Sequence, residues 1–139
     1  MNSKNLNFFA SMAVAVIVTV ASGCEELGKR LNMPVDEEVR LRAQAWADHL
    51  IAGDIEGAWA LTSPSYRQFS TWQQYYPRVQ GSSNWTSATV DSVRCTEDVC
   101  DVSVMVEYEL RTMKMSNRRP LDYKWVKVSG DWWLHVPAK

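Results

Sequence analysis

The chain lacks the features that mark several protein classes. Its 139 residues include only three cysteines and two histidines, which is too few for a disulfide scaffold and too sparse for a structural zinc site. The net charge of −1 gives no basic footprint for duplex nucleic acid, and 46% apolar residues exclude a disordered polyelectrolyte. No glycine-rich phosphate loop, nucleophile elbow or metal-binding box occurs. We therefore expect one globular domain with no metal, no cofactor and no nucleic-acid partner.

The chain also lacks an apolar run long enough to cross a membrane. After Lys4, an uncharged stretch extends from Phe8 to Val20, about 13 residues against the ~20 that a spanning helix needs. A short positive start, a short apolar middle and small residues at the end are typical of a secretory signal. The segment Ala21-Ser22-Gly23-Cys24 then resembles a bacterial lipobox, although Ala21 stands where that motif usually has Leu.

This resemblance implies cleavage before Cys24 and a diacylglycerol on its thiol. The expected organisation is a lipoprotein signal peptide over residues 1–23, the lipidated Cys24 with a short tether over residues 24–35, and a domain over residues 36–139. Acyl chains at Cys24 would hold the domain on the bacterial envelope, facing the periplasm, on either the inner or the outer membrane. An uncleaved anchor and an ordinary signal peptide are the alternatives.

The two remaining cysteines flank a predicted hairpin turn. With a two-residue turn at Glu97-Asp98, Cys95 and Cys100 form a non-hydrogen-bonded pair whose Cα atoms lie ~4.5 Å apart. In an oxidising compartment such a pair forms a disulfide. A redox-active pair is the alternative, but the spacing is C-x4-C and no helix start follows.

Helical patterns come first in the domain and strand patterns follow. A helix opening at Asp36 buries a stripe of apolar residues at helical spacing, and Gly53 ends it. Asp54 caps a second, short helix, and a capping box at Ser70 opens a third, which Pro77 limits or kinks. Strands are predicted over 87–94, 101–110, 121–128 and 132–136. The predicted fold class is α+β, with N-terminal helices packed against about four antiparallel strands.

Two segments resemble the nuclear transport factor 2-like domains. The stretch from Ala45 to Pro64 has their cadence of a helix, Gly-Asp, a short helix and Ser-Pro, and Gly130-Asp131-Trp132-Trp133-Leu134 is similar to their last hairpin. The resemblance covers about residues 35–136. It implies a curved antiparallel sheet wrapped around helices as a cone, whose mouth holds the pocket in members that bind small molecules. A steroid isomerase and a dehydratase belong to this group.

Catalytic members of that group place an Asp, or an Asp and a His, inside the cone. His49 lies at the flank of the first helical stripe, so it is either a half-buried helix residue or part of a pocket. Asp91 would face Val104 if the register set by Cys95 and Cys100 continued. It would then be a buried carboxylate with a raised pKa, able to act as a base. A bulge that turns Asp91 outward is the alternative.

Several aromatic residues could line a pocket or fill the core. The pocket candidates are Trp46, Trp59, Tyr108 and Trp125. Because neighbouring strand residues point to opposite faces, either Trp132 or Trp133 should lie on the outer face as a partner surface. The basic stretch 111–119 is expected to be a hairpin loop, either solvated or touching anionic headgroups.

These features favour a non-enzymatic module of the bacterial envelope. It would bind a ligand in the cone, or dock on an envelope protein or a second copy through the outer face of the sheet. The alternatives are an isomerase- or dehydratase-type enzyme that uses Asp91 or His49, and a binder of envelope glycan through exposed aromatics.

Overall fold

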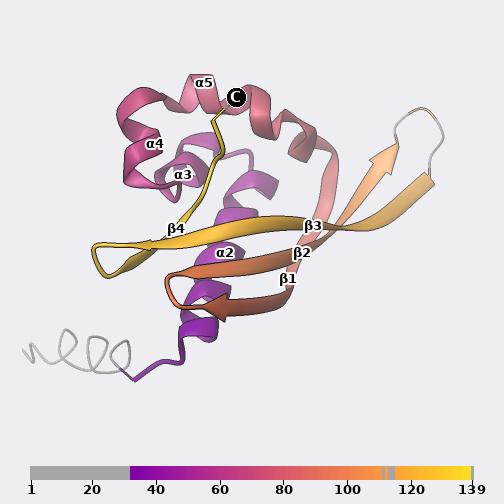
Figure 1. The fold of residues 1–139 in the computed structure, drawn as a ribbon. Helices are drawn as coiled ribbons and strands as arrows, with labels where there is room; N and C mark the ends of the chain where they lie inside the picture. Colours follow the sequence, from indigo (N-terminus) through magenta and orange to yellow (C-terminus); the bar gives the residue numbers. More distant parts are fainter. Residues whose placement is uncertain (1–31, 111, 113–114, 139) are drawn as a thin grey trace, which may run out of the picture. The chain divides into compact units, whose positions relative to one another are not determined.

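The computed structural model describes residues 32–110, 112 and 115–138. The predicted signal peptide, Cys24 and most of the predicted tether lie outside the described residues. Within the described part, helices precede four antiparallel strands that lie side by side in the order β1-β2-β3-β4 (Figure 1). The strands are β1 (Trp85–Thr96), β2 (Val99–Leu110), β3 (Met115–Val128) and β4 (Asp131–Leu134). The predicted α+β class is confirmed.

The helical part contains more elements than the sequence predicts. They are α2 (Val35–Ile51), α3 (Ile55–Ala60), α4 (Pro64–Phe69), α5 (Trp72–Val79) and the 3₁₀ helix η1 (Gln80–Asn84). Helix α2 lies across one face of the sheet, and α3, α4 and α5 gather at one end of it (Figure 1). The predicted stripe of α2 is buried, because the helix packs on the sheet and mainly against β1. The buried apolar residues are Val39, Ala43, Trp46, Ala47 and Leu50 on α2, Ala88 and Val90 on β1, and Cys100, Val102, Val104 and Val106 on β2.

The three predicted helix starts, at Asp36, Asp54 and Ser70, lie within two residues of the observed cap positions. Asp54 caps α3 as expected, and its Oδ1 accepts a hydrogen bond from the backbone N–H of Gly57 at 2.9 Å. Asp36, in contrast, lies in the first turn of α2, and Pro34 occupies the cap position. The capping box is built on Thr71 rather than Ser70: the Thr71 hydroxyl accepts from the Gln74 N–H at 3.4 Å, and the Gln74 side-chain oxygen accepts from the Thr71 N–H at 2.9 Å.

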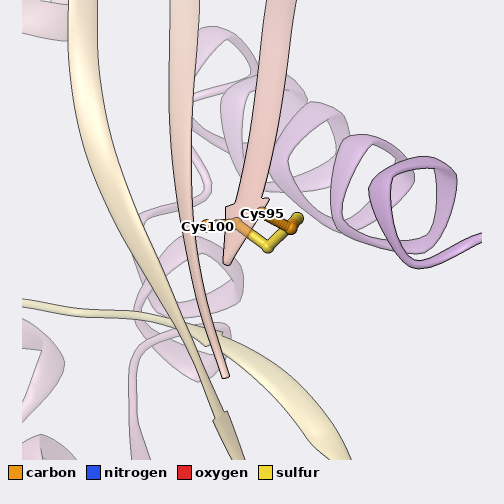
Figure 2. The surroundings of a disulfide bond; sticks show 2 residues. All are labelled: Cys95 and Cys100. Atoms are coloured by element: carbon orange, nitrogen blue, oxygen red, sulfur yellow. A yellow bond between two sulfur atoms is a disulfide. The ribbon is translucent and has the colours of Figure 1, made fainter. Parts of the chain in front are cut away.

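The hairpin disulfide is present as predicted. Cys95 lies opposite Cys100 in the β1–β2 ladder, and the two sulfur atoms are bonded with a Cα–Cα distance of 4.0 Å (Figure 2). Thr96 and Val99 close the turn, in which Glu97 adopts a φ of 52°. Because Glu favours a left-handed backbone poorly, the covalent bridge helps to fix this register.

Side chains of α2 hydrogen-bond to the outer edge of β1. The Gln44 amide donates to the Ala88 carbonyl and accepts from the Val90 N–H, each at 3.0 Å, while Arg40 donates to the Val90 carbonyl at 2.9 Å. The ladder with β2 shifts by one residue between Val90 and Ser92. The helix therefore satisfies the strand's outward-facing backbone groups beside an irregularity that would otherwise weaken the sheet.

Strand β3 is longer than predicted and β4 is shorter. Residues 115–119, which we expected in a hairpin loop, already pair with β2, so β3 begins at Met115. β4 pairs with the last four residues of β3, and its other edge is held by Leu61 and Ser63 through hydrogen bonds to both backbone groups of Leu134. Pro120 lies opposite Met105, within the part of β3 that extends beyond β4.

The two adjacent tryptophans of β4 have different surroundings. Trp132 is fully buried, whereas Trp133 is half-buried, so adjacent residues do differ in exposure as alternation requires. The guanidinium carbons of Arg42 and Arg67 each lie 4.8 Å from the centre of the Trp133 ring. Cation–π contacts of this kind cover the ring with the chain's own side chains, so Trp133 is not a bare aromatic surface.

Candidate functional site

A cavity of about 580 Å³ opens between the helical end and the distal part of the sheet. This volume is within the range of ~300–1,000 Å³ that is typical of small-molecule sites. Its walls come from the C-terminal parts of α2, α5 and β2, from η1, from the middle of β3, from the start of β1, and from the end of β4 with the segment after it. The lining residues include Trp46, Tyr75, Arg78, Ser82, Tyr108, Glu109, Arg119, Leu121, Tyr123 and His135.

The deep wall of the cavity consists of aromatic side chains. The Trp46 indole N–H donates to the Tyr75 hydroxyl at 3.0 Å, and the Trp46 and Tyr123 rings meet edge to face with centroids 4.6 Å apart. Desolvation raises the pKa of Tyr75 well above its ordinary value, and it raises the pKa of Tyr123 to about 12. Both hydroxyls therefore remain neutral hydrogen-bonding groups at physiological pH.

Two arginines lie where the cavity meets solvent. Arg119 is on β3 directly opposite Val106, so it shares the inward face of the sheet with Leu121 and Tyr123. Arg78 follows Tyr75 by three residues on α5 and therefore projects on the same side of that helix. Glu109 is the acidic residue of the described lining, and it is exposed. The formal charge of the lining side chains is therefore positive.

Of the aromatic pocket candidates, the structure brings Trp46 and Tyr108 to the cavity. Trp125 is fully buried in the core, where it lies between Cys100 and Leu134 across the sheet. Trp59 packs at the helical end, with its indole hydrogen-bonded to Ser70. Neither Trp125 nor Trp59 lines the cavity. The sequence could not separate these two residues from pocket residues, because aromatics of the core and of a pocket follow the same spacing.

Asp91 is outside the cavity. The register expected from the cysteine pair would place it opposite Val104, but Val90 occupies that position, because the ladder shifts by one residue at Asp91. The extra residue leaves the Asp91 side chain exposed. The predicted alternative, a bulge that turns Asp91 outward, describes the structure.

His49 is also outside the cavity. Its Nδ1 lies 2.8 Å from Asp54 Oδ2, and the side chains of His49 and Asp54 are 39% and 50% exposed. The hydrogen bond from the Gly57 N–H, followed by the contact with His49, lowers the pKa of Asp54, although burial opposes the effect. A Cβ at Gly57 would collide with both side chains, so a larger residue there would displace the pair. The pair belongs to the junction of α2 and α3 and does not meet the cavity.

Sequence reasoning missed both arginines of the cavity mouth. A usable signal existed for Arg119, because the alternation Leu121, Tyr123, Trp125 continues backward to it at the same period of two. Arg78 follows a proline at the end of a short helix and gave no comparable signal. Across residues 32–110, 112 and 115–138, no group of three or more His, Cys, Asp or Glu side chains is arranged to hold a metal ion.

No protein-family model matches the chain, and no curated protein sequence matches it. Several solved structures do align with the chain. A SEC-C motif containing protein from Psychrobacter arcticus aligns with a TM-score of 0.57 at 10% identity, over 79% of this chain and 66% of that one. A SEC-C motif containing protein from Rhodopseudomonas palustris aligns with a TM-score of 0.51 at 13% identity, over 81% of this chain and 85% of that one.

A third solved structure is a Campylobacter jejuni protein named as a putative NTF2-like transpeptidase. It aligns with a TM-score of 0.46 at 10% identity, over 68% of this chain and 94% of that one. At such identities the two stronger matches establish a shared arrangement of helices and antiparallel strands, and they say nothing about activity. None of the helices in the described part is long and apolar enough to cross a membrane.

Proposed function

We propose that this protein is an exported, lipid-anchored module of the nuclear transport factor 2-like type that binds a small ligand in the mouth of its cone. Three features support the proposal. The first is the lipobox-like segment that ends at Cys24. The second is the Cys95–Cys100 disulfide, which is expected to persist in an oxidising compartment such as the bacterial periplasm. The third is the aromatic cavity, and this observation carries the functional part of the proposal.

Binding is favoured over catalysis by the chemistry of the lining. An isomerase- or dehydratase-type mechanism needs a general base within reach of a bound substrate. The candidate bases Asp91 and His49 lie away from the cavity, and the two potential bases in its described lining, Glu109 and His135, are exposed residues. What the cavity offers instead is apolar surface with a few hydroxyl and guanidinium groups, which is the usual composition of a binding site.

The cavity also ranks ahead of the outer sheet face as the functional surface. Outward-facing charges on β2 and β3 pair with each other, as Asp101 does with Lys124 at 2.6 Å and Glu107 with Arg118 at 3.7 Å. A docking partner, whether an envelope protein or a second copy, would have to displace or match these pairs. Exposed ion pairs of this kind favour a solvated face.

The anchor is tested by mass spectrometry of the protein purified from bacterial membranes. We expect the N-terminus at Cys24 with diacylglycerol attached, and we expect a Cys24→Ala variant to leave the membrane fraction. Recovery of the intact leader, or of a protein with an unmodified Cys24, would refute the anchoring part of the proposal.

The binding site is tested with N-phenylnaphthylamine, a neutral dye that fluoresces in apolar surroundings. We expect saturable binding to the wild-type protein and loss of binding in Leu121→Trp, which fills the cavity. Val128→Trp is the matched control, because Val128 is on the same strand but away from the cavity. Absence of saturable binding, or equal binding by both variants, would refute the cavity as the functional site.

A further inference from the structure

We propose that the cavity selects amphipathic anions: molecules with an apolar body and a single carboxylate, sulfonate or phosphate group. The apolar body would lie against Leu121 and Tyr123, and the anionic group would lie between Arg78 and Arg119. This inference rests on the proposed ligand-binding function and adds the chemical class of the ligand.

The position of Arg119 carries the first step. Its neighbour Arg118 points to the other face of the sheet and has an acidic partner, Glu107, at 3.7 Å. Arg119 instead faces Val106 across the ladder, which is 1% exposed, with Leu121 next to it on the same face. Its cross-strand neighbour within the described residues is thus apolar, and its planar guanidinium suits a carboxylate or phosphate from solution.

Arg78 supplies a second positive charge from the helical wall. Its guanidinium carbon lies 5.9 Å from the centre of the Tyr66 ring, so the side chain is held by an aromatic face rather than by an acid. The two arginines thus reach the cavity from α5 and from β3, on its two sides. A bound anion would meet positive charge from both walls, whereas the acidic residue that the described lining offers to a cation is the exposed Glu109.

Neutral hydroxyl groups complete the site for an anion. Tyr75 is 2% exposed and Ser82 is 4% exposed, and both line the cavity. Because burial keeps Tyr75 and Tyr123 protonated, their O–H groups can donate hydrogen bonds to a ligand oxygen without adding negative charge. The tyrosine rings offer apolar surface to the rest of the ligand.

Three amphiphiles with the same tail and different head groups test the charge preference. Dodecanoate, dodecanol and dodecyltrimethylammonium, each below its micellar concentration, compete with N-phenylnaphthylamine for the purified protein at neutral pH. We expect dodecanoate to bind about tenfold or more tightly than dodecanol, since hydrogen bonds to charged groups are worth more than neutral ones. We expect dodecyltrimethylammonium to bind most weakly, and added salt to reduce the preference for dodecanoate.

Single variants locate the preference within the cavity. Arg119→Gln and Arg78→Gln should each lose most of the preference for dodecanoate while retaining affinity for the neutral dye, which shows that the cavity is intact. Arg118→Gln is the matched control, because it removes the same charge from the adjacent residue on the opposite face. Arg119→Lys should keep part of the preference, and this conservative variant tests the arginine position if Arg119→Gln fails to fold.

The outcomes separate this inference from the proposed function. Equal affinities for dodecanoate and dodecanol, or tighter binding of the cation, would overturn the anion preference while dye binding still supports a ligand site. Equal losses in Arg118→Gln and Arg119→Gln would overturn it as well, because the preference would then reflect overall charge. Failure of the dye and of all three amphiphiles to bind would overturn both proposals.

Discussion

Raising the pH above about 10 should destabilise the fold through its two buried tyrosines. Tyr75 and Tyr123 have raised pKa values in the folded protein because burial disfavours the phenolate. In the unfolded chain both should titrate near 10.0, the ordinary value for tyrosine. The stabilisation is therefore fully present below pH 10 and is lost as the pH rises toward the folded-state values, since only the unfolded chain releases these protons.

The size of the effect follows from the pKa of Tyr123, about 12. At about pH 11 the unfolded tyrosine is mostly ionised and the folded one mostly neutral, so Tyr123 alone lowers the free energy of unfolding by about 1.4 kcal/mol. Tyr75, whose folded-state pKa is higher still, lowers it by a similar amount. The total of about 3 kcal/mol is a large part of the ~5–15 kcal/mol by which small domains are stable.

Urea unfolding followed by tryptophan fluorescence at about pH 9 and about pH 11 measures this loss. Tyr123→Phe should remove roughly half of the decrease, because a phenylalanine has no proton to release. An equal free energy of unfolding at the two pH values would refute the reasoning. So would a Tyr123→Phe variant with the same decrease as the wild type, since the titrating groups would then lie elsewhere.

Three other changes have distinct expected outcomes. Replacing Cys95 and Cys100 together by Ala should lower the free energy of unfolding by about 2 kcal/mol, the entropic contribution of a loop this short, and an unchanged urea midpoint would contradict it. Asp91→Asn should change stability by less than about 0.5 kcal/mol and leave dye affinity unaltered; a measurable loss of binding would return Asp91 to the site. Tyr75→Phe should cost about 1–3 kcal/mol in thermal or urea unfolding, because the Trp46 indole loses its buried acceptor, and a neutral result would argue against that hydrogen bond.

Local patterns predicted the parts of this fold that depend on local chemistry. The stripe of α2 follows from helical periodicity, and the Asp54 cap follows from the preference of Asp for that position. The Cys95–Cys100 pair follows from two strands that alternate about a short turn. Each of these depends on residues within a few positions of one another, so the sequence alone was sufficient.

The features that the sequence left open or missed depend on contacts between distant residues. The irregularity at Asp91 lies beside backbone groups of Val90 that bind Gln44 and Arg40, some fifty residues earlier. No pattern within β1 reveals those partners, so the sequence leaves an uninterrupted register and a bulge at Asp91 as two open alternatives. Arg119 was assigned to a loop because charged residues dominate its neighbourhood, and only its pairing with β2 shows that it faces the cavity.

The two edges of the sheet are both blocked against pairing with a strand of another molecule, and this matters where many copies lie close together. Beside β3 residues 115–123 no further strand lies within the described part of the chain, and an open edge of that length invites a second molecule to add its own strand. Pro120 removes a donor from that edge, and on β1 the Gln44 amide already occupies the backbone groups that a newcomer would need. Neither border presents an uninterrupted hydrogen-bonding row. If anchored copies are concentrated in the plane of a membrane as proposed, they can collide often without joining into edge-to-edge aggregates.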